Sequence, residues 1–137
     1  MWWIYALLSA FFAALTAILA KIGIKGIDTN LATAIRTVVI LLLAWAIVFW
    51  KQEANGIHGL TKQNWTFLVL SGLATGLSWI FYFKALQMGK VSQVAPVDKA
   101  SVAMALILSV LFLGEPLTIK TAIGAVMIIG GTIVMIL

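Results

Sequence analysis

Apolar residues fill this chain in long unbroken runs, and polar residues gather in short stretches between them. A helix needs about 20 apolar residues to cross a hydrocarbon core of about 30 Å, and the runs have this length. They are continuous and do not alternate with period two, which excludes the strands of a transmembrane barrel. The sequence therefore predicts an all-α integral membrane protein with five transmembrane helices at residues 3–20, 31–50, 65–88, 91–113 and 119–137.

Capping and helix-ending residues lie between the predicted spans. Thr61 and Thr118 stand where hydroxyls can cap the third and fifth spans. The stretch Gly114-Glu115-Pro116 is expected to end the fourth span. The long polar connection at 51–64 contains Asn55-Gly56, which predicts a turn.

Tryptophan placement supports the count of five spans. Tryptophan rings prefer the membrane interface. With five spans in succession, the starts of spans one, three and five share a side with the ends of spans two and four. Trp2, Trp3, Trp50 and Trp65 all fall on that side, which we call the near side, opposite the far side.

Composition narrows the function classes. The chain is 64% hydrophobic and 9% charged, has no cysteine, and has a single histidine, His58. We therefore expect no disulfide, metal site or cofactor. One histidine and four acids, three of them at loop positions, cannot assemble a nucleophile, a base and an orienting group, so an enzyme is not expected.

The net charge of +5 comes from basic residues placed singly at span ends. This spacing suits lipid headgroups and orientation signals, and no nucleic-acid partner is expected. No basic region precedes the first apolar run, so we interpret that run as a retained span and not as a cleaved signal peptide.

Orientation is not decided by the loop lysines. Three lie on the near side (Lys51, Lys62, Lys120) and three on the far side (Lys21, Lys25, Lys90). Adding three bases within or near the span ends, Arg36, Lys84 and Lys99, gives six to three and would put the far side in the cytoplasm. A weak bias is typical of a chain inserted in both orientations, and two antiparallel copies would reproduce the inverted repeats of many transporters. A single orientation is the alternative.

Polar residues form a stripe on the third span. Ser71, Thr75, Ser78 and Tyr82 follow at helical spacing, beside Gly72, Gly76 and Trp79. One interpretation is a tightly packed helix contact, because the two glycines form a GxxxG pattern. The other is a cavity wall, with Trp79 and Tyr82 giving flat apolar surface and the hydroxyls giving orientation.

The fourth span carries an acid and a base, Asp98 and Lys99, two residues after Pro96. Asp98 shares a helix face with Ser101, Ala105 and Ser109, so it is expected to point toward protein. Lys99 is turned about 100° away and is not expected to pair with it. The proline either opens the helix or frees the carbonyl of Ser92 within a kinked helix.

Depth identifies the charge that needs a partner. Arg36 and Lys84 lie about 9 Å inside the far-side boundary and Asp98 about 12 Å inside it. Long basic side chains can reach back to the interface, whereas aspartate cannot. Arg36 is the most plausible partner of Asp98, with Lys84 and Lys99 as the other candidates.

This cluster has two interpretations, a structural ion pair and a substrate-binding or proton-coupling site that also includes Ser101. If the lysines face inward, the excess of bases at this level would favour an anionic or zwitterionic solute. On the fifth span, Gly124 and Gly131 are spaced as in a helix seam, which is a candidate dimer contact or an intramolecular one.

Two stretches carry a resemblance to a known family: YFKALQMGKVSQVAPVDKASV at 82–102 and FLGEPLT at 112–118. The chain resembles the EamA-like family of the drug/metabolite transporter superfamily, in particular its small bacterial and archaeal five-span members. The resemblance covers nearly all of residues 1–137 and implies a single five-span domain that forms one inverted-repeat unit of a ten-helix transporter. It implies a homodimer with a central cavity and alternating access.

The chain is also similar to the four-span small multidrug resistance proteins, but it departs from them at one point. They place a glutamate in the first span as the shared proton and cation site, and residues 3–20 contain no acid. Proton-coupled export of cationic drugs is therefore not expected.

The hypothesis from sequence is a multi-pass transporter of a small organic solute in the cell inner membrane, working as an antiparallel homodimer. Its partners would be the solute, the lipid bilayer and a second copy. The alternative is a non-transporting membrane protein that serves as a partner or subunit of a larger complex.

Overall fold

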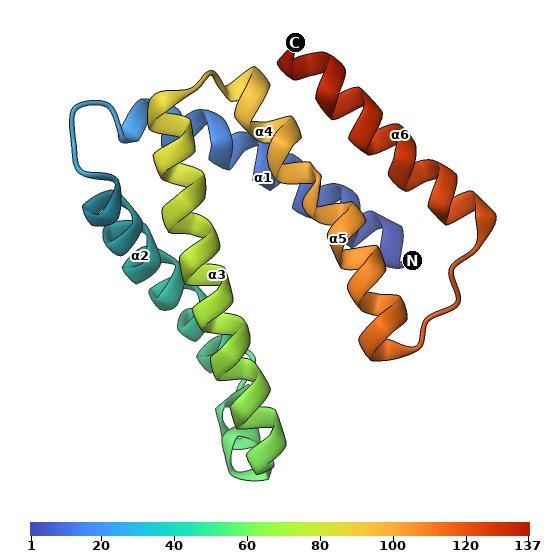
Figure 1. The fold of residues 1–137 in the computed structure, drawn as a ribbon. Coiled ribbons are helices and arrows are strands. Elements are labelled where there is room, and N and C mark those ends of the chain that lie inside the picture. The colour runs from blue at the N-terminus through green and yellow to red at the C-terminus, as the bar shows by residue number, and fades with distance from the viewer. The chain divides into compact units, whose positions relative to one another are not determined.

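The computed structural model describes residues 1–137 and contains helices and turns but no strand. Five helical segments are long and apolar enough to cross a membrane, which confirms the predicted all-α membrane architecture. The spans are α1 (Trp2–Gly23), α2 (Thr29–Trp50), α3 (Lys62–Met88), a composite fourth span, and α6 (Ile119–Ile136) (Figure 1). The fourth span consists of α4 (Val91–Lys99), α5 (Ser101–Leu108) and the π-helix η2 (Ser109–Leu113). A short 3₁₀ helix, η1 (Glu53–Gly59), occupies the connection where a turn is predicted.

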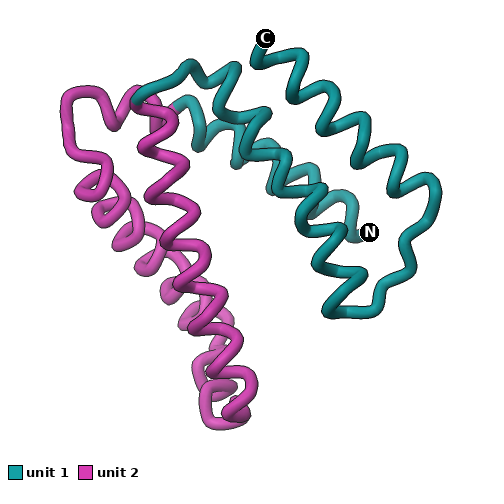
Figure 2. The backbone as a smooth tube through the Cα atoms, viewed as in Figure 1, with its two compact units in different colours: residues 1–18, 88–137 teal, residues 19–87 magenta.

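The chain divides into two compact units (Figure 2). Unit 1 comprises residues 1–18 and 88–137, and therefore holds most of α1 together with the fourth span and α6. Unit 2 comprises residues 19–87 and holds the end of α1, α2, η1 and α3.

Unit 2 is a helical hairpin whose helix starts are capped by side chains. Asp28 accepts a hydrogen bond from the amide of Asn30 at 2.7 Å and caps α2. Thr61 accepts from the amide of Asn64 at 3.2 Å, so the predicted cap of the third span is confirmed. The buried residues of this unit gather at the end of α1, the start of α2 and the last turns of α3: Ala20, Ile24, Thr29, Ala32, Thr33, Phe83 and Leu86.

In unit 1, α6 packs against α4 and α5. Thr118 caps α6 as predicted, accepting from the amide of Thr121 at 3.2 Å. The fourth span ends at the predicted place, where Gly114 adopts a left-handed conformation (φ 66°) that favours glycine.

The fourth span is interrupted in its middle. Pro96 is the sixth residue of α4, so it lies inside the helix and does not open it. The proline lacks the amide hydrogen that would bond the carbonyl of Ser92. A second irregularity follows on its other side, where the amide of Ala100 donates to the carbonyl of Val97 at 3.0 Å and not to that of Pro96.

Thr132 of α6 bonds the carbonyl that this turn leaves without its helical donor. Its hydroxyl lies 3.1 Å from the carbonyl oxygen of Pro96 and 2.8 Å from that of Ile128 in its own helix. The residue is buried, with 8% of its surface exposed. In a bilayer no water can satisfy a carbonyl, so this contact joins α4 to α6 where the fourth span is irregular.

The glycines predicted as a dimer contact are not closely packed within the chain. Gly124 is half-buried and Gly131 is exposed, and a Cβ added at either position would meet no atom within 4 Å. At the neighbouring Thr132 the contact is intramolecular. The dimer contact through Gly124 and Gly131 stays a prediction.

We expect Thr132→Val to destabilise the protein, because valine keeps the shape of threonine but leaves the Pro96 carbonyl without this donor. The expected loss in free energy of unfolding is about 1 kcal/mol. The measurement is an unfolding titration of the purified protein in detergent micelles.

Thr75→Val is the matched control, because the Thr75 hydroxyl is exposed and donates only to the carbonyl of Ser71 in its own helix, at 2.9 Å. Equal losses in the two variants would show that the Thr132–Pro96 contact contributes nothing to stability.

Candidate functional site

Arg36 is held between aromatic rings inside unit 2. The carbon of its guanidinium lies 4.3 Å from the ring centroid of Phe83 and 5.5 Å from that of Trp79. Both distances fall within the range of cation–π attraction, which strengthens where water is excluded. Its Nη1 atom is buried and has no hydrogen-bond partner. A guanidinium with an unused donor of this kind is suited to receive an anionic oxygen.

The two rings come from one face of α3. Trp79 and Phe83 are four residues apart, so their side chains lie one above the other on the helix. Phe83 is 1% exposed and Trp79 is half-buried. Phe83 was not among the predicted site residues. Its spacing of four from Trp79 is the signal that could have indicated it.

The position of Arg36 within a membrane span makes its charge costly in free energy. It lies seven residues after the start of α2, about 10 Å along the helix axis, in a segment long and apolar enough to span the membrane. Charged groups at such positions mark solute or ion pathways in many membrane proteins. The aromatic faces lower this cost, but they supply no acceptor for the Nη1 hydrogens.

Two threonines share the α2 face of Arg36, but their hydroxyl protons are already used. Thr33 donates to the carbonyl of Thr29 at 2.7 Å, and Thr37 donates to that of Thr33 at 2.8 Å. These bonds stay within α2, so neither hydroxyl has a proton left for an incoming group.

The predicted hydroxyl stripe of α3 lies to one side of the face that carries Trp79 and Phe83. Ser71, Thr75 and Ser78 are exposed, and Tyr82 is half-buried, with its ring 5.9 Å from that of Phe83. No atom comes within 4 Å of a Cβ added at Gly72 or Gly76, so no tight helix contact forms at the GxxxG pattern. The stripe is therefore open to another surface. Its role as a cavity wall stays a prediction.

Lys84 is not brought to the hydroxyl stripe. At about 100° per residue it points to the opposite side of α3 from Thr75 and Ser78, and it is exposed. A lysine with this exposure can extend toward the interface.

In unit 1, Asp98 and Lys99 form the contact that the helical spacing argued against. The Lys99 Nζ atom lies 3.3 Å from a carboxylate oxygen of Asp98, with 58% and 36% of the two side chains exposed. The prediction that they would not pair is wrong because it assumed a regular helix, whereas α4 ends at Lys99 and the flexible lysine side chain bends back. Arg36 belongs to unit 2 and Asp98 to unit 1, and their pairing stays a prediction.

The face of the fourth span that meets α6 is apolar. Ser101 and Ala105 are exposed, and Ser109 donates to the carbonyl of Leu106 at 3.0 Å. An apolar cavity of about 360 Å³ lies between α5, η2 and α6. Its lining residues are Ala103, Leu106, Ile107, Val110, Leu111, Leu117, Ala122, Ala125, Val126 and Ile129. The predicted polar face therefore does not turn toward α6.

Comparison with known proteins assigns the chain to a family. The model of the EamA-like transporter family matches residues 1–137. The chain belongs to the EamA-like transporter family. An "Uncharacterized transporter in cobO 3'region" from Sinorhizobium sp. is 49% identical over 134 residues, which cover 98% of this chain and 95% of that protein. No solved structure matches the chain.

Membership of the EamA-like family, the relative named as a transporter and the five apolar helices support a multi-pass membrane transporter. For an EamA-like transporter, the embedded guanidinium between two aromatic rings and the nearby hydroxyl stripe are the features of unit 2 that are suited to contact a polar solute.

Proposed function

We propose that the protein carries a small organic solute across the cell inner membrane by alternating access. The whole chain acts as a single five-span domain and pairs with a second, antiparallel copy to give a ten-helix transporter. The solute pathway runs past Arg36, Trp79 and Tyr82, with the hydroxyls of Thr75 and Ser78 beside them.

The observation that carries this proposal is the unsatisfied guanidinium of Arg36. A buried donor without an acceptor is costly, more so when it is charged. Its two aromatic neighbours lie close to the guanidinium carbon and offer its hydrogens no lone-pair acceptor. The arrangement supports a solute that brings an anionic or zwitterionic group, with apolar parts that can lie against the rings.

The open polar surface of α3 supports a second copy. The exposed residues Ser71, Thr75 and Ser78 lie on a helix of membrane-spanning length, where lipid would offer them nothing. Only 6–11% of each apolar span window is buried within the chain, so most of each span is left for lipid or another protein. The equal number of loop lysines on the two sides supports insertion in both orientations, and two oppositely inserted five-span copies would pair antiparallel.

Asp98 is the proposed coupling group. It lies seven residues after the start of α4 and its contact with Lys99 is half-exposed, so the pair can open at little cost. Either protonation of Asp98 or a competing cation would release Lys99. We propose that this exchange links proton or solute binding to the change between inward-facing and outward-facing states.

We expect Arg36→Gln to lower solute uptake into proteoliposomes at least about tenfold, because a charge-assisted contact at a desolvated site is lost. The measurement is uptake from a panel of labelled carboxylates, amino acids and quaternary amines. Lys62→Gln removes the same charge from the exposed start of α3 and serves as the control. Equal uptake by wild type and Arg36→Gln for every solute transported would contradict the proposed pathway.

Asp98→Asn should remove the response of transport to an imposed pH gradient while the protein remains folded, because asparagine keeps the size of the side chain but cannot titrate. The comparison is the uptake rate with and without the gradient in wild type and variant. Wild-type rate and wild-type pH dependence in Asp98→Asn would exclude a coupling role.

Reporter fusions test the antiparallel dimer. A C-terminal fusion to an enzyme active only in the cytoplasm and a fusion to one active only outside it should both give signal, because the loop lysines set no strong bias. Signal from one fusion alone, in cells that make both in equal amount, would exclude dual insertion.

A further inference from the structure

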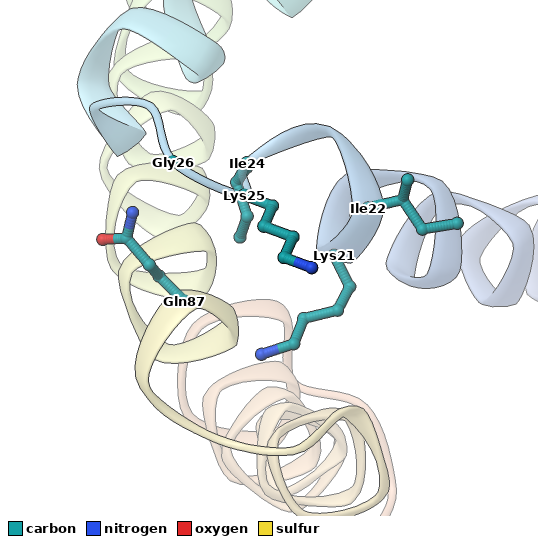
Figure 3. A pocket seen from close by; sticks show the side chains of 6 residues that line it. All are labelled: Lys21, Ile22, Ile24, Lys25, Gly26 and Gln87. Carbon is teal, nitrogen blue, oxygen red and sulfur yellow. The ribbon is translucent and has the colours of Figure 1, made fainter.

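A cavity with basic residues in its lining lies in unit 2, at the ends of α1 and α3 (Figure 3). Its volume is about 520 Å³. It is lined by Lys21, Ile22, Ile24, Lys25, Gly26 and Gln87. The site proposed for the solute uses none of these residues.

Two side-chain bonds from these residues fix the cavity walls. The Lys21 ammonium donates to the carbonyl of Leu86 at 2.5 Å, in the last turn of α3, where helix carbonyls lack their own donors. Gln87 donates from Nε2 to the carbonyl of Ile27 at 2.9 Å. The last turn of α1 and the turn that follows it are thereby each attached to the end of α3, and Figure 3 shows Lys21 on α1, Lys25 on the turn and Gln87 on α3.

The side chains that line the cavity are basic or uncharged. Its lining contains two lysines and no aspartate or glutamate. The nearest acid in the sequence is Asp28, whose carboxylate accepts from the amide of Asn30 and caps α2. Lys25 is exposed and forms no ion pair. An anion entering the cavity would therefore meet an unpaired ammonium.

The rim of the cavity is apolar and stands at the membrane boundary. Lys21 lies in the last turn of the first span, Lys25 lies two residues after its end, and Gln87 is one residue before the end of the third span. Ile22 is 68% exposed beside them. An amphiphile with an anionic head and an apolar tail fits this combination, because basic pockets at span ends bind lipid headgroups.

We propose that this cavity binds a phosphate group, with Lys25 and Lys21 as its cationic contacts. The apolar rim at the boundary makes an anionic lipid headgroup the expected source, and a small soluble phosphate has the same head chemistry. This site does not depend on the proposed solute pathway.

Lysines at span ends also act as orientation signals, and the two roles make different demands. An orientation signal needs only charge on the correct side, so any basic residue nearby serves. A binding site needs its charge at one position. The test therefore compares lysines of equal charge and different place.

The experiment measures phosphatidylglycerol bound to the purified full chain by native mass spectrometry, together with the thermal shift that this lipid produces in detergent. Lys25→Gln should lower bound lipid about fivefold, because one ammonium near the headgroup is lost. Lys25→Arg should keep the binding. The Lys25 side chain makes no hydrogen bond or ion pair within the chain, so its variants are expected to fold.

Lys51→Gln is the matched control, an exposed lysine at the other end of α2. Equal loss of lipid in Lys25→Gln and Lys51→Gln would mean general charge attraction and would overturn the site. Pyrophosphate is the second probe. One outcome is that pyrophosphate alone stabilises wild type, with no stabilisation of Lys25→Gln and no binding or thermal shift from phosphatidylglycerol. That result would support the phosphate site with a soluble phosphate as its ligand.

Discussion

A backbone amide or carbonyl inside a bilayer must find its hydrogen-bond partner within the protein. In this chain, side chains supply that partner where a helix is interrupted or ends. Regular helices satisfy this requirement without side chains. Where the fourth span breaks after Pro96, the hydroxyl of Thr132 in α6 bonds the carbonyl that Ala100 leaves. Where α3 ends, Lys21 bonds the carbonyl of Leu86, and Gln87 bonds that of Ile27. Side chains at helix irregularities thus provide contacts between segments within each unit.

The low dielectric constant of the bilayer also requires that each charge within a span be stabilised by the protein. Arg36 is stabilised by ring faces and keeps unused hydrogens, whereas Asp98 and Lys99 neutralise each other in a half-exposed contact. Arg36 is stabilised but keeps a hydrogen-bond donor without an acceptor. The Asp98–Lys99 ion pair has both partners, but a half-exposed pair contributes little free energy. The alternating-access cycle proposed above would use groups of both kinds, one to receive a solute and one to change partners.

The sequence predicted what depends on length and local chemistry. Five apolar runs predicted five spans, and the caps at Thr61 and Thr118 followed from residue type and place. Contacts between helices were harder to predict. Phe83 looks like any apolar residue until α2 is placed against it, and the Asp98–Lys99 contact required knowledge that the helix ends there. Thr132 stood among glycines that suggested a seam, while its actual acceptor is a carbonyl released 36 residues earlier.

Thr132 has a single hydroxyl proton and two carbonyl oxygens within reach, one in its own helix and one in α4. When the proton turns from Pro96 to Ile128, α6 loses nothing and the donor never goes unbonded. The contact between α4 and α6 can therefore open without first exposing a bare hydroxyl to lipid. Among the hydrogen bonds of this turn, only that of the Pro96 carbonyl would be lost on such an opening.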